Sequence, residues 1–190
     1  MDDLVKLKAR LSELLVAKSV CHGEFTLVSG AKSDFYVDSK LTTLDPEGSW
    51  LLGKLGWDLI KRVRQAKGIN LAAIGGLTMG ADPIAHAISM VSWLDEPGQA
   101  LQTFSVRKSP KAHGRNKLIE GSFQEGQTVV VVDDVITTGG STLAAIDAVV
   151  GAGGQVAFVV VLVDRQEGGR ANIEKRGCEV HPLFTRQDLS

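Results

Sequence analysis

Residues 129–142 read VVVVDDVITTGGST, a pattern that predicts a buried strand, a turn and the start of a helix. The unbroken run of valines is typical of a strand covered on both faces of a parallel sheet. Two carboxylates, Asp133 and Asp134, come where this run ends, and the apolar pattern LAAIDAVV continues the chain as a helix. The stretch therefore predicts an α/β fold with a ligand site at the carboxyl end of this strand.

The turn at 137–142, TTGGST, has the composition of an anion site. A glycine-rich turn that enters a helix presents backbone N–H groups and the positive end of the helix dipole, and its hydroxyls add donors. We expect the turn to bind a monophosphate, and Asp133 and Asp134 to bind sugar hydroxyls or a hydrated Mg²⁺. The plain alternative is a capped helix without a ligand. A Walker-B acid is excluded because the chain has no GxxxxGK[ST] loop.

The composition is that of an ordinary globular domain. With 190 residues, of which 44% are hydrophobic, the chain can bury a sizeable core as one domain. A formal net charge of −1 gives no sign of a nucleic-acid or membrane partner. The longest apolar run, 157–164, is too short to span a bilayer, and the N-terminus lacks an apolar signal core. Cys21 and Cys178 have no CxxC spacing, so we expect reduced cysteines in a cytoplasmic protein.

Helices and strands alternate along the rest of the chain. Leucines between positions 4 and 15 predict an amphipathic first helix, and residues 25–48 predict a β-hairpin with its turn at Ser29-Gly30. Asp45 before Pro46 predicts the start of the next helix, and Gly68 its end. Further strands are expected at 71–74, 101–108, 155–164 and 179–184, and further helices from Asp82-Pro83 to 91 and at 170–177. Right-handed crossovers then place helices on both faces of a parallel sheet of about five strands.

A second glycine turn, GGLTMG at 75–80, follows the strand expected at 71–74. It repeats the strand–turn–helix order and suits a second anionic group such as pyrophosphate. Many α/β crossovers carry such a turn for packing alone, so this signal is weak by itself. His86, inside the following helix, is interpreted as a packing or interface residue.

Residues 107–117, the basic segment, contain five cations, one histidine and no acid: Arg107, Lys108, Lys111, Arg115, Lys117 and His113. Loops this long between strands are usually functional or mobile, and this one lacks charge compensation. We interpret it as a lid over a polyphosphate. A solvated basic loop and an RNA-binding loop are the alternatives, although no aromatic residue is interleaved to stack on bases.

Arg165 follows the strand expected at 155–164 and so lies at the same sheet edge as Asp133. An arginine there can pair bidentately with a planar carboxylate or with an imide carbonyl. Surface pairing with Asp164 or Glu167 is an equally open interpretation.

Five segments resemble those of the orotate phosphoribosyltransferases: FTLVSGAKSDFYVD, GGLTMGADPIA, VRKSPKAHG, VVVVDDVITTGGST and VDRQEGG. They occur in that family's order and spacing over nearly the whole chain. VVVVDDVITTGGST resembles the phosphoribosyl-pyrophosphate (PRPP) motif of the type I phosphoribosyltransferases, whereas purine phosphoribosyltransferases lack the combination of FTLVSG with RKSPKAHG. The resemblance implies one type I phosphoribosyltransferase domain over 1–190, with a small N-terminal hood at 1–45 and a mobile catalytic loop at 105–121.

The same resemblance implies a Mg²⁺-dependent reaction of orotate with PRPP, which gives orotidine 5′-monophosphate and pyrophosphate in pyrimidine biosynthesis. It implies a cytoplasmic homodimer that shares the basic loop between subunits, Mg²⁺ carried mainly by PRPP, and no nucleic-acid or membrane partner. The alternatives are a non-catalytic RNA-binding regulator of the same fold and an enzyme for another base. Near-zero net charge argues against the regulator, and an acidic base suits Arg165.

Residue roles follow from the matching motif positions. The catalytic residues would be Lys111, His113, Asp133 and Asp134. The PRPP-binding residues would be Arg107, Lys108, Lys111, His113, Asp133, Asp134, Val135, Ile136, Thr137, Thr138, Gly139, Gly140 and Ser141. The orotate-binding residues would be Phe35, Tyr36, Thr137 and Arg165. Some family members carry substrate-binding lysines where Val28 and Met79 stand here, and we hypothesise that Lys40 or Lys32 compensates.

Overall fold

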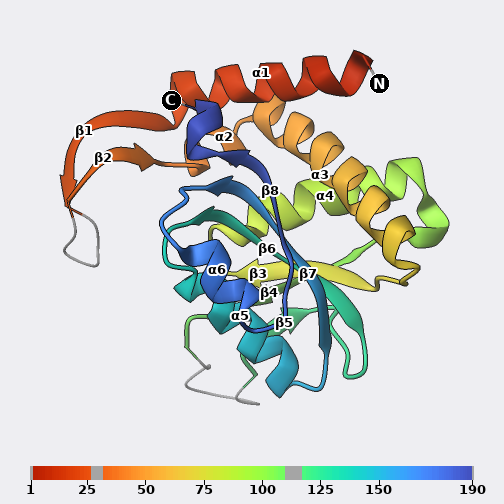
Figure 1. The fold of residues 1–190 in the computed structure, drawn as a ribbon. Coiled ribbons are helices and arrows are strands. Elements are labelled where there is room, and N and C mark those ends of the chain that lie inside the picture. The colour runs from red at the N-terminus through yellow and green to blue at the C-terminus, as the bar shows by residue number, and fades with distance from the viewer. Residues whose placement is uncertain (1, 27–31, 110–116, 190) are drawn as a thin grey trace.

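The computed structural model describes residues 2–26, 32–109 and 117–189 and contains a central sheet between two layers of helices (Figure 1). The strands of this sheet are β3 (Ala73–Leu77), β4 (Gln102–Val106), β5 (Ile119–Gly121), β6 (Thr128–Ile136), β7 (Gln155–Asp164) and β8 (Val180–Thr185). Their order is β5-β4-β3-β6-β7-β8, so β5 and β8 form the edges. Five strands are parallel and β5 is antiparallel to β4, which confirms the predicted parallel sheet.

Helices cover both faces of the sheet. Helices α1 (Asp2–Lys18), α3 (Pro46–Lys67) and α4 (Ala81–Asp95) lie on one side, and α5 (Gly140–Gly151) and α6 (Gly169–Glu174) lie on the other (Figure 1). Each face of the sheet has its own hydrophobic core: the first core includes residues of α1, α3 and α4, and the second includes residues of α5 and α6. The valines of β6 alternate between them, with Val130 and Val132 in the first core and Val129 and Val131 in the second. This burial on two faces explains the unbroken run of four valines, Val129 to Val132, in this strand. No helix in the described part of the chain has the length and apolar character of a membrane span.

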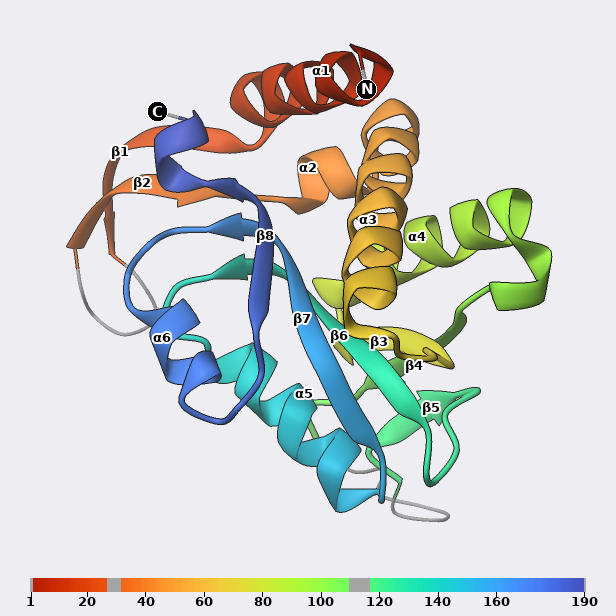
Figure 2. The same ribbon diagram turned by 45° about the vertical axis from the view of Figure 1, so that its right-hand side comes forward.

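The N-terminal segment forms a small separate sheet. Strands β1 (Val20–Thr26) and β2 (Lys32–Val37) pair in antiparallel fashion, which confirms the predicted hairpin, while its expected turn at Ser29-Gly30 lies outside the described residues. The hairpin lies over the carboxyl ends of β6 and β7 (Figure 2). A helix of four residues, α2 (Lys40–Thr43), joins it to α3 and was not predicted from the sequence. The hairpin therefore lies at the carboxyl end of the central strands, near which Asp133 and Asp134 are found.

Helix α3 begins and ends where the sequence predicts. The Asp45 side chain accepts a hydrogen bond from the Gly48 N–H at 3.0 Å, and Pro46 is the first helical residue. Gly68 ends the helix in the left-handed conformation, with φ of 62°. The residues that begin and end this helix are local signals, so the limits of the helix could be predicted from the sequence.

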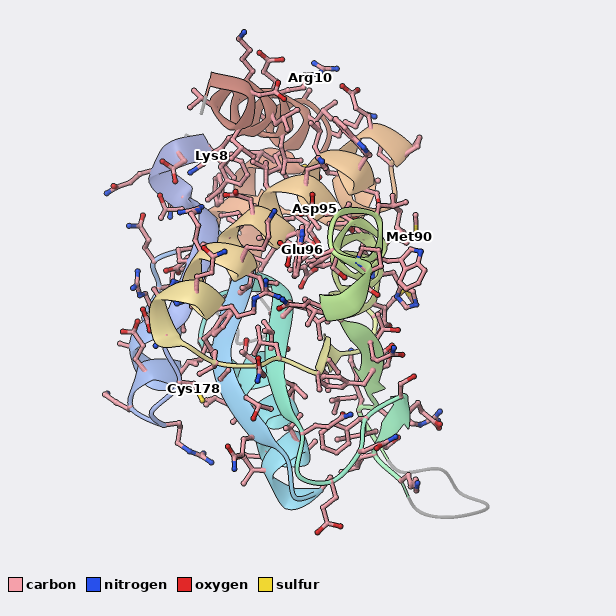
Figure 3. All side chains as sticks on the ribbon, turned by 90° about the vertical axis from the view of Figure 1, so that its right-hand side faces the viewer. Lys8, Arg10, Met90, Asp95, Glu96 and Cys178 are labelled. Carbon is pink, nitrogen blue, oxygen red and sulfur yellow. The ribbon has the colours of Figure 1, made fainter. Side chains whose placement is uncertain are left out.

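Polar contacts fix α3 against α4, the helix that follows the second glycine turn. Asp95 and Glu96, at the end of α4, lie between the two helices (Figure 3). Trp57 Nε1 donates to Asp95 Oδ2 at 2.9 Å, and Arg64 Nη2 donates to Glu96 Oε2 at 2.8 Å. Short 3₁₀ helices, η1 (Pro97–Gln99) and η2 (Arg186–Leu189), follow α4 and β8.

The predicted boundary between β3 and its turn is wrong. Gly75 and Gly76 belong to β3 and are not turn residues. A Cβ added to Gly75 would lie 2.0 Å from the Phe104 carbonyl oxygen, and one added to Gly76 would lie 2.1 Å from the Val132 carbonyl oxygen. The glycines therefore permit close approach of the neighbouring strands, and the turn begins only at Thr78.

Candidate active site

The acid pair, Asp133 and Asp134, lies near the carboxyl end of β6, two residues before the turn that leads into α5. Asp133 is 4% exposed. Its Oδ2 accepts a hydrogen bond from Thr142 Oγ1 at 2.6 Å, and its Oδ1 accepts one from the Asp134 N–H at 3.1 Å. Because Thr142 is in the first turn of α5, these bonds hold the acid and the start of the helix in one arrangement.

The environment of Asp133 disfavours its charge. Burial raises the pKa of Asp133 to about 7, the Thr142 hydrogen bond opposes this rise, and the neighbouring Asp134 carboxylate adds to it. A ligand that donates hydrogen bonds to Asp133 would replace the water that burial removes from the carboxylate. The site therefore favours a partner rich in hydroxyl groups.

Residues 137–141, which we name the phosphate turn, comprise the connection between β6 and α5 and the first two residues of α5. Gly139 has φ of 85°, a left-handed conformation that favours glycine, and it directly precedes α5. Helix α6 holds the turn through two hydrogen bonds. The Gly169 N–H donates to the Thr137 carbonyl at 2.9 Å, and Asn172 Nδ2 donates to the Thr138 carbonyl at 3.1 Å. The turn is thus anchored through its carbonyl groups at the start of a helix, an arrangement suited to an anion.

Residues 78–80, the second turn, lie beside the acid pair. A Cβ added to Gly80 would lie 2.5 Å from Asp134 Oδ1, so this glycine is in close contact with the carboxylate. The peptide bond between Thr78 and Met79 is cis. Asp82 supports the turn by accepting hydrogen bonds from Thr78 Oγ1 at 2.7 Å and from Ser105 Oγ at 2.6 Å. Sequence reasoning found Asp82 only as a helix start, because its partners come from two separate segments.

The hood contacts the acid pair through Ser39, which sequence reasoning missed. Ser39 is 1% exposed, and its Oγ donates to Asp134 Oδ2 at 2.5 Å. The neighbouring Lys40 forms an ion pair with Asp38, Nζ to Oδ1 at 2.9 Å. The hydrogen bond to Asp38 raises the pKa of Lys40, and the charge of Asp134 contributes in the same direction. Lys40 therefore lies within electrostatic reach of the acid pair.

Arg165 lies next to the end of β6, as predicted. Its backbone N–H donates to the Ile136 carbonyl at 3.1 Å. The side chain is 4% exposed, and its Nη2 lies 2.7 Å from Glu167 Oε1. The structure shows the pairing with Glu167 that the sequence left open, but the arginine is buried and not at the surface.

The two hood aromatics have different surroundings. Phe35 is 1% exposed in the first core, and the Arg186 guanidinium lies 5.2 Å from the centre of its ring. Tyr36, the next residue along β2, is 39% exposed. Tyr36 is therefore the residue of this pair whose side chain a ligand can reach, while Phe35 holds β2 to the core.

The remaining predicted residues divide into three groups. Val135 and Ile136 lie within β6, and the Ile136 side chain is buried in the second core, so a contact to a ligand there would use the backbone. Arg107 is half-buried, with its Nη1 3.8 Å from Glu120 Oε1, and Lys108 is exposed. Lys111 and His113 lie outside the described residues.

The chain is similar in sequence to known proteins. A family model described as the phosphoribosyl transferase domain matches residues 55–181. The orotate phosphoribosyltransferase of Aquifex aeolicus is 45% identical over 181 residues, 95% of this chain and 94% of that protein. The orotate phosphoribosyltransferase of Rhodopirellula baltica is 39% identical over 95% of this chain and 93% of that protein.

The chain is also similar to proteins whose structures have been solved. The chain is similar to Mycobacterium tuberculosis orotate phosphoribosyltransferase in complex with Fe(III) dicitrate, with 42% identity and a TM-score of 0.81 over 97% of this chain and 99% of that one. The complex of the M. tuberculosis enzyme with PRPP gives 35% identity and a TM-score of 0.75 over 97% and 92%. An adenine phosphoribosyltransferase from Leishmania tarentolae, at 18% identity and a TM-score of 0.61 over 95% and 89%, shares the fold alone.

Proposed function

Because this chain belongs to the orotate phosphoribosyltransferase family of enzymes, we propose that its acid pair and phosphate turn bind PRPP for transfer to orotate. The ribose hydroxyls donate to Asp133 and Asp134, and the turn at 137–141 binds the 5′-phosphate. The observation that carries this proposal is the buried Asp133 carboxylate, bonded to Thr142 at the start of the helix that follows the turn. The donors of the phosphate turn thus match the phosphate of a ribose phosphate, and the two carboxylates match its hydroxyl groups.

Orotate would lie between the hood and the end of β7. Arg165 would pair with the orotate carboxylate or with its imide carbonyl, in exchange for Glu167. Thr137 and the exposed side of Tyr36 complete this pocket, with Phe35 supporting Tyr36 from the core. An acidic base is the one that a buried arginine selects best.

The pyrophosphate end of PRPP would meet the second turn and the basic segment. Arg107, Lys108, Lys111 and His113 are the proposed ligands, with part of the segment reaching the site of a neighbouring subunit in a homodimer. Among the described residues, no three His, Cys, Asp or Glu side chains are placed to hold a metal together. Mg²⁺ is commonly bound by substrate phosphates with few protein ligands, so it fits here as an ion carried mainly by PRPP. When bound, it neutralises charge on the diphosphate.

The reaction requires the protein to stabilise charge and to position its two substrates. Pyrophosphate leaves the anomeric carbon as the orotate nitrogen attacks, through an oxocarbenium-like transition state. Negative charge grows on the leaving oxygen, where the cations of the basic segment act. The acid pair and the phosphate turn hold the sugar, and Arg165 orients the base for attack. No covalent intermediate with the protein is required.

A direct test follows the absorbance of orotate on mixing the protein with PRPP and Mg²⁺. We expect a decrease that requires both PRPP and Mg²⁺. A control without Mg²⁺ tests the requirement for the metal. Controls with uracil or adenine in place of orotate identify the base that the protein accepts. Transfer to uracil or adenine in preference to orotate would contradict the assignment of the base, and RNA binding without any turnover would favour the regulator.

Arg165→Lys is expected to raise the KM for orotate by roughly tenfold or more with a smaller change in the KM for PRPP. A lysine keeps the charge but loses the bidentate pairing, and hydrogen bonds to charged groups contribute about 1.5–3 kcal/mol. Steady-state kinetics with each substrate varied in turn measures this. The matched control is Arg170→Lys on α6, an exposed arginine paired with Glu174. Equal effects on the two KM values would argue against a contact with the base.

Lys40→Ala is expected to raise the KM for the substrates by roughly two- to fivefold, the range of a partly exposed charge interaction. Lys40 is 45% exposed at its side chain, and the charge of Asp134 contributes to the raised pKa of Lys40, which supports the hypothesis that it compensates for a family lysine. Initial rates of the variant and of Lys54→Ala, on α3, provide the comparison. Unchanged kinetics would remove Lys40 from consideration.

A further inference from the structure

Ser39 is the residue through which the hood contacts the acid pair. It lies between β2 and α2, and its Oγ donates to Asp134 Oδ2 at 2.5 Å although 95 positions separate the two residues. At 1% exposure, the hydroxyl is shielded from water. A hydrogen bond to a carboxylate in such surroundings is stronger than one between neutral groups in solvent.

The backbone around Ser39 is fixed independently of this bond. The Ser39 carbonyl accepts hydrogen bonds from the N–H groups of Thr42 at 2.9 Å and Thr43 at 2.8 Å. Ser19, the residue after α1, holds the same segment, because its hydroxyl pairs with Thr42 Oγ1 at 2.7 Å and its carbonyl accepts from the Asp38 N–H at 2.9 Å. Removal of the Ser39 hydroxyl would therefore release Asp134 while α2 keeps its other anchors.

Asp134 has contacts on two sides. Its Oδ2 accepts from Ser39, and Gly80 of the second turn lies against the same carboxylate. Asp133, by contrast, is held by Thr142 from within its own β6–α5 unit. The two acids are thus oriented by different parts of the chain, and the orientation of Asp134 depends on the hood.

We propose that Ser39 is a positioning residue that orients the Asp134 carboxylate toward the ribose hydroxyls of PRPP. This inference rests on the proposed function, in which Asp134 binds the ribose. A carboxylate oxygen accepts more than one hydrogen bond, so Ser39 can remain bound while a sugar hydroxyl donates to the same group. The hood then contributes to PRPP binding as well as to the orotate pocket.

The test compares Ser39→Thr with Ser39→Val, two variants of nearly equal shape that differ in the hydroxyl. Any packing effect of the added methyl group is common to both. We expect kcat/KM for PRPP to be roughly 10- to 100-fold lower in Ser39→Val than in Ser39→Thr, the range for a lost hydrogen bond to a charged group. Most of this loss should appear in the KM for PRPP if the carboxylate binds the ground state, and in kcat if it acts mainly in the transition state.

Ser19→Ala is the matched control, because it removes a buried hydroxyl from the same hood segment without touching Asp134. It should lower thermal stability while leaving the KM for PRPP within about twofold of wild type. A second measurement is a double-mutant cycle, in which Ser39→Ala should have little further effect once Asp134 is replaced by alanine.

The outcomes separate this inference from the proposed function. If the wild-type protein does not convert orotate and PRPP, the proposed function fails, and the inference that rests on it fails with it. If wild type is active, Ser39→Val rates within threefold of Ser39→Thr would overturn the role of Ser39 alone. An equal loss in Ser19→Ala, or full additivity of Ser39→Ala with Asp134→Ala, would also overturn it by showing a general effect of the hood.

Discussion

Lys111→Ala is expected to lower kcat by about 10²–10³ while leaving the folded protein unchanged. In the transition state, negative charge develops on the departing pyrophosphate, and a positioned cation there stabilises that state more than the ground state. Loss of one well-placed contact of this kind commonly lowers the rate by roughly 10²–10³. Steady-state rates, with thermal unfolding measured on the same samples, test this.

The control for Lys111→Ala is Lys175→Ala, which removes an exposed cation at the end of α6. Its rate should equal that of wild type. A kcat of Lys111→Ala within a few-fold of the wild-type value would show that Lys111 is not the cation of the basic segment that contributes most to the rate.

The same variant can test the proposed sharing of the basic segment between subunits. A mixture of Lys111→Ala and Asp133→Asn chains, allowed to exchange subunits, should recover activity that neither has alone. A heterodimer would then contain one site with an intact acid pair and an intact Lys111 from its neighbour. Absence of recovery after verified subunit exchange would place Lys111 in the site of its own chain.

Asp133→Asn is expected to abolish most activity and, at the same time, to stabilise the ligand-free protein above pH 7. An amide cannot accept both ribose hydroxyls as a carboxylate does, so kcat/KM for PRPP should fall by roughly 10². The fold keeps its local contacts, because the amide oxygen can accept from the Asp134 N–H while Nδ2 donates to Thr142 Oγ1.

The stability change follows from the raised pKa of Asp133. Between the unperturbed value of 3.8 and about 7, the folded protein keeps a proton on Asp133 that the unfolded chain has lost. The free energy of unfolding of wild type therefore falls as pH rises through this window, relative to the variant. The difference in stability between the two proteins should therefore grow from pH 4.5 to pH 8.

Urea unfolding of both proteins at pH 4.5, 6 and 8 measures this difference. Carboxyl groups whose pKa is lowered, such as Asp95 and Asp188, are present in both proteins and cancel in the comparison. Asp147→Asn, an exposed change on α5, serves as the control and should follow wild type. Parallel pH dependence of wild type and Asp133→Asn would contradict the raised pKa.

The parts of this protein that could be predicted are those whose signals are contiguous in the chain. The valine run, the acid pair and the glycine turn identify β6, the site and α5, because burial on two faces and a helix start both leave local patterns. Asp45 and Gly68 likewise mark the limits of α3. The family motifs extended this reading to the substrate.

What could not be predicted depends on contacts between distant segments. Gly75 and Gly76 read as a turn, but the approach of β4 and β6 places them in a strand. Asp82 accepts hydrogen bonds from two segments, and Ser39 contacts Asp134, which is 95 positions away in the sequence. Short elements such as α2 and β5 carry too few residues for a periodic pattern. Phe35 and Tyr36 looked alike in sequence and differ in burial through their alternation along β2.

The two edge strands of the sheet also bear on how the chain avoids aggregation. An exposed strand edge offers unpaired backbone groups to another molecule and can seed cross-β association. Here β5 is three residues long and ends at Gly121, with φ of 94°, which bends the backbone out of a regular strand. At the other edge, β8 contains Pro182, which has no N–H to offer to an added strand. Both edges of the folded sheet are therefore poor templates for the addition of strands from another molecule.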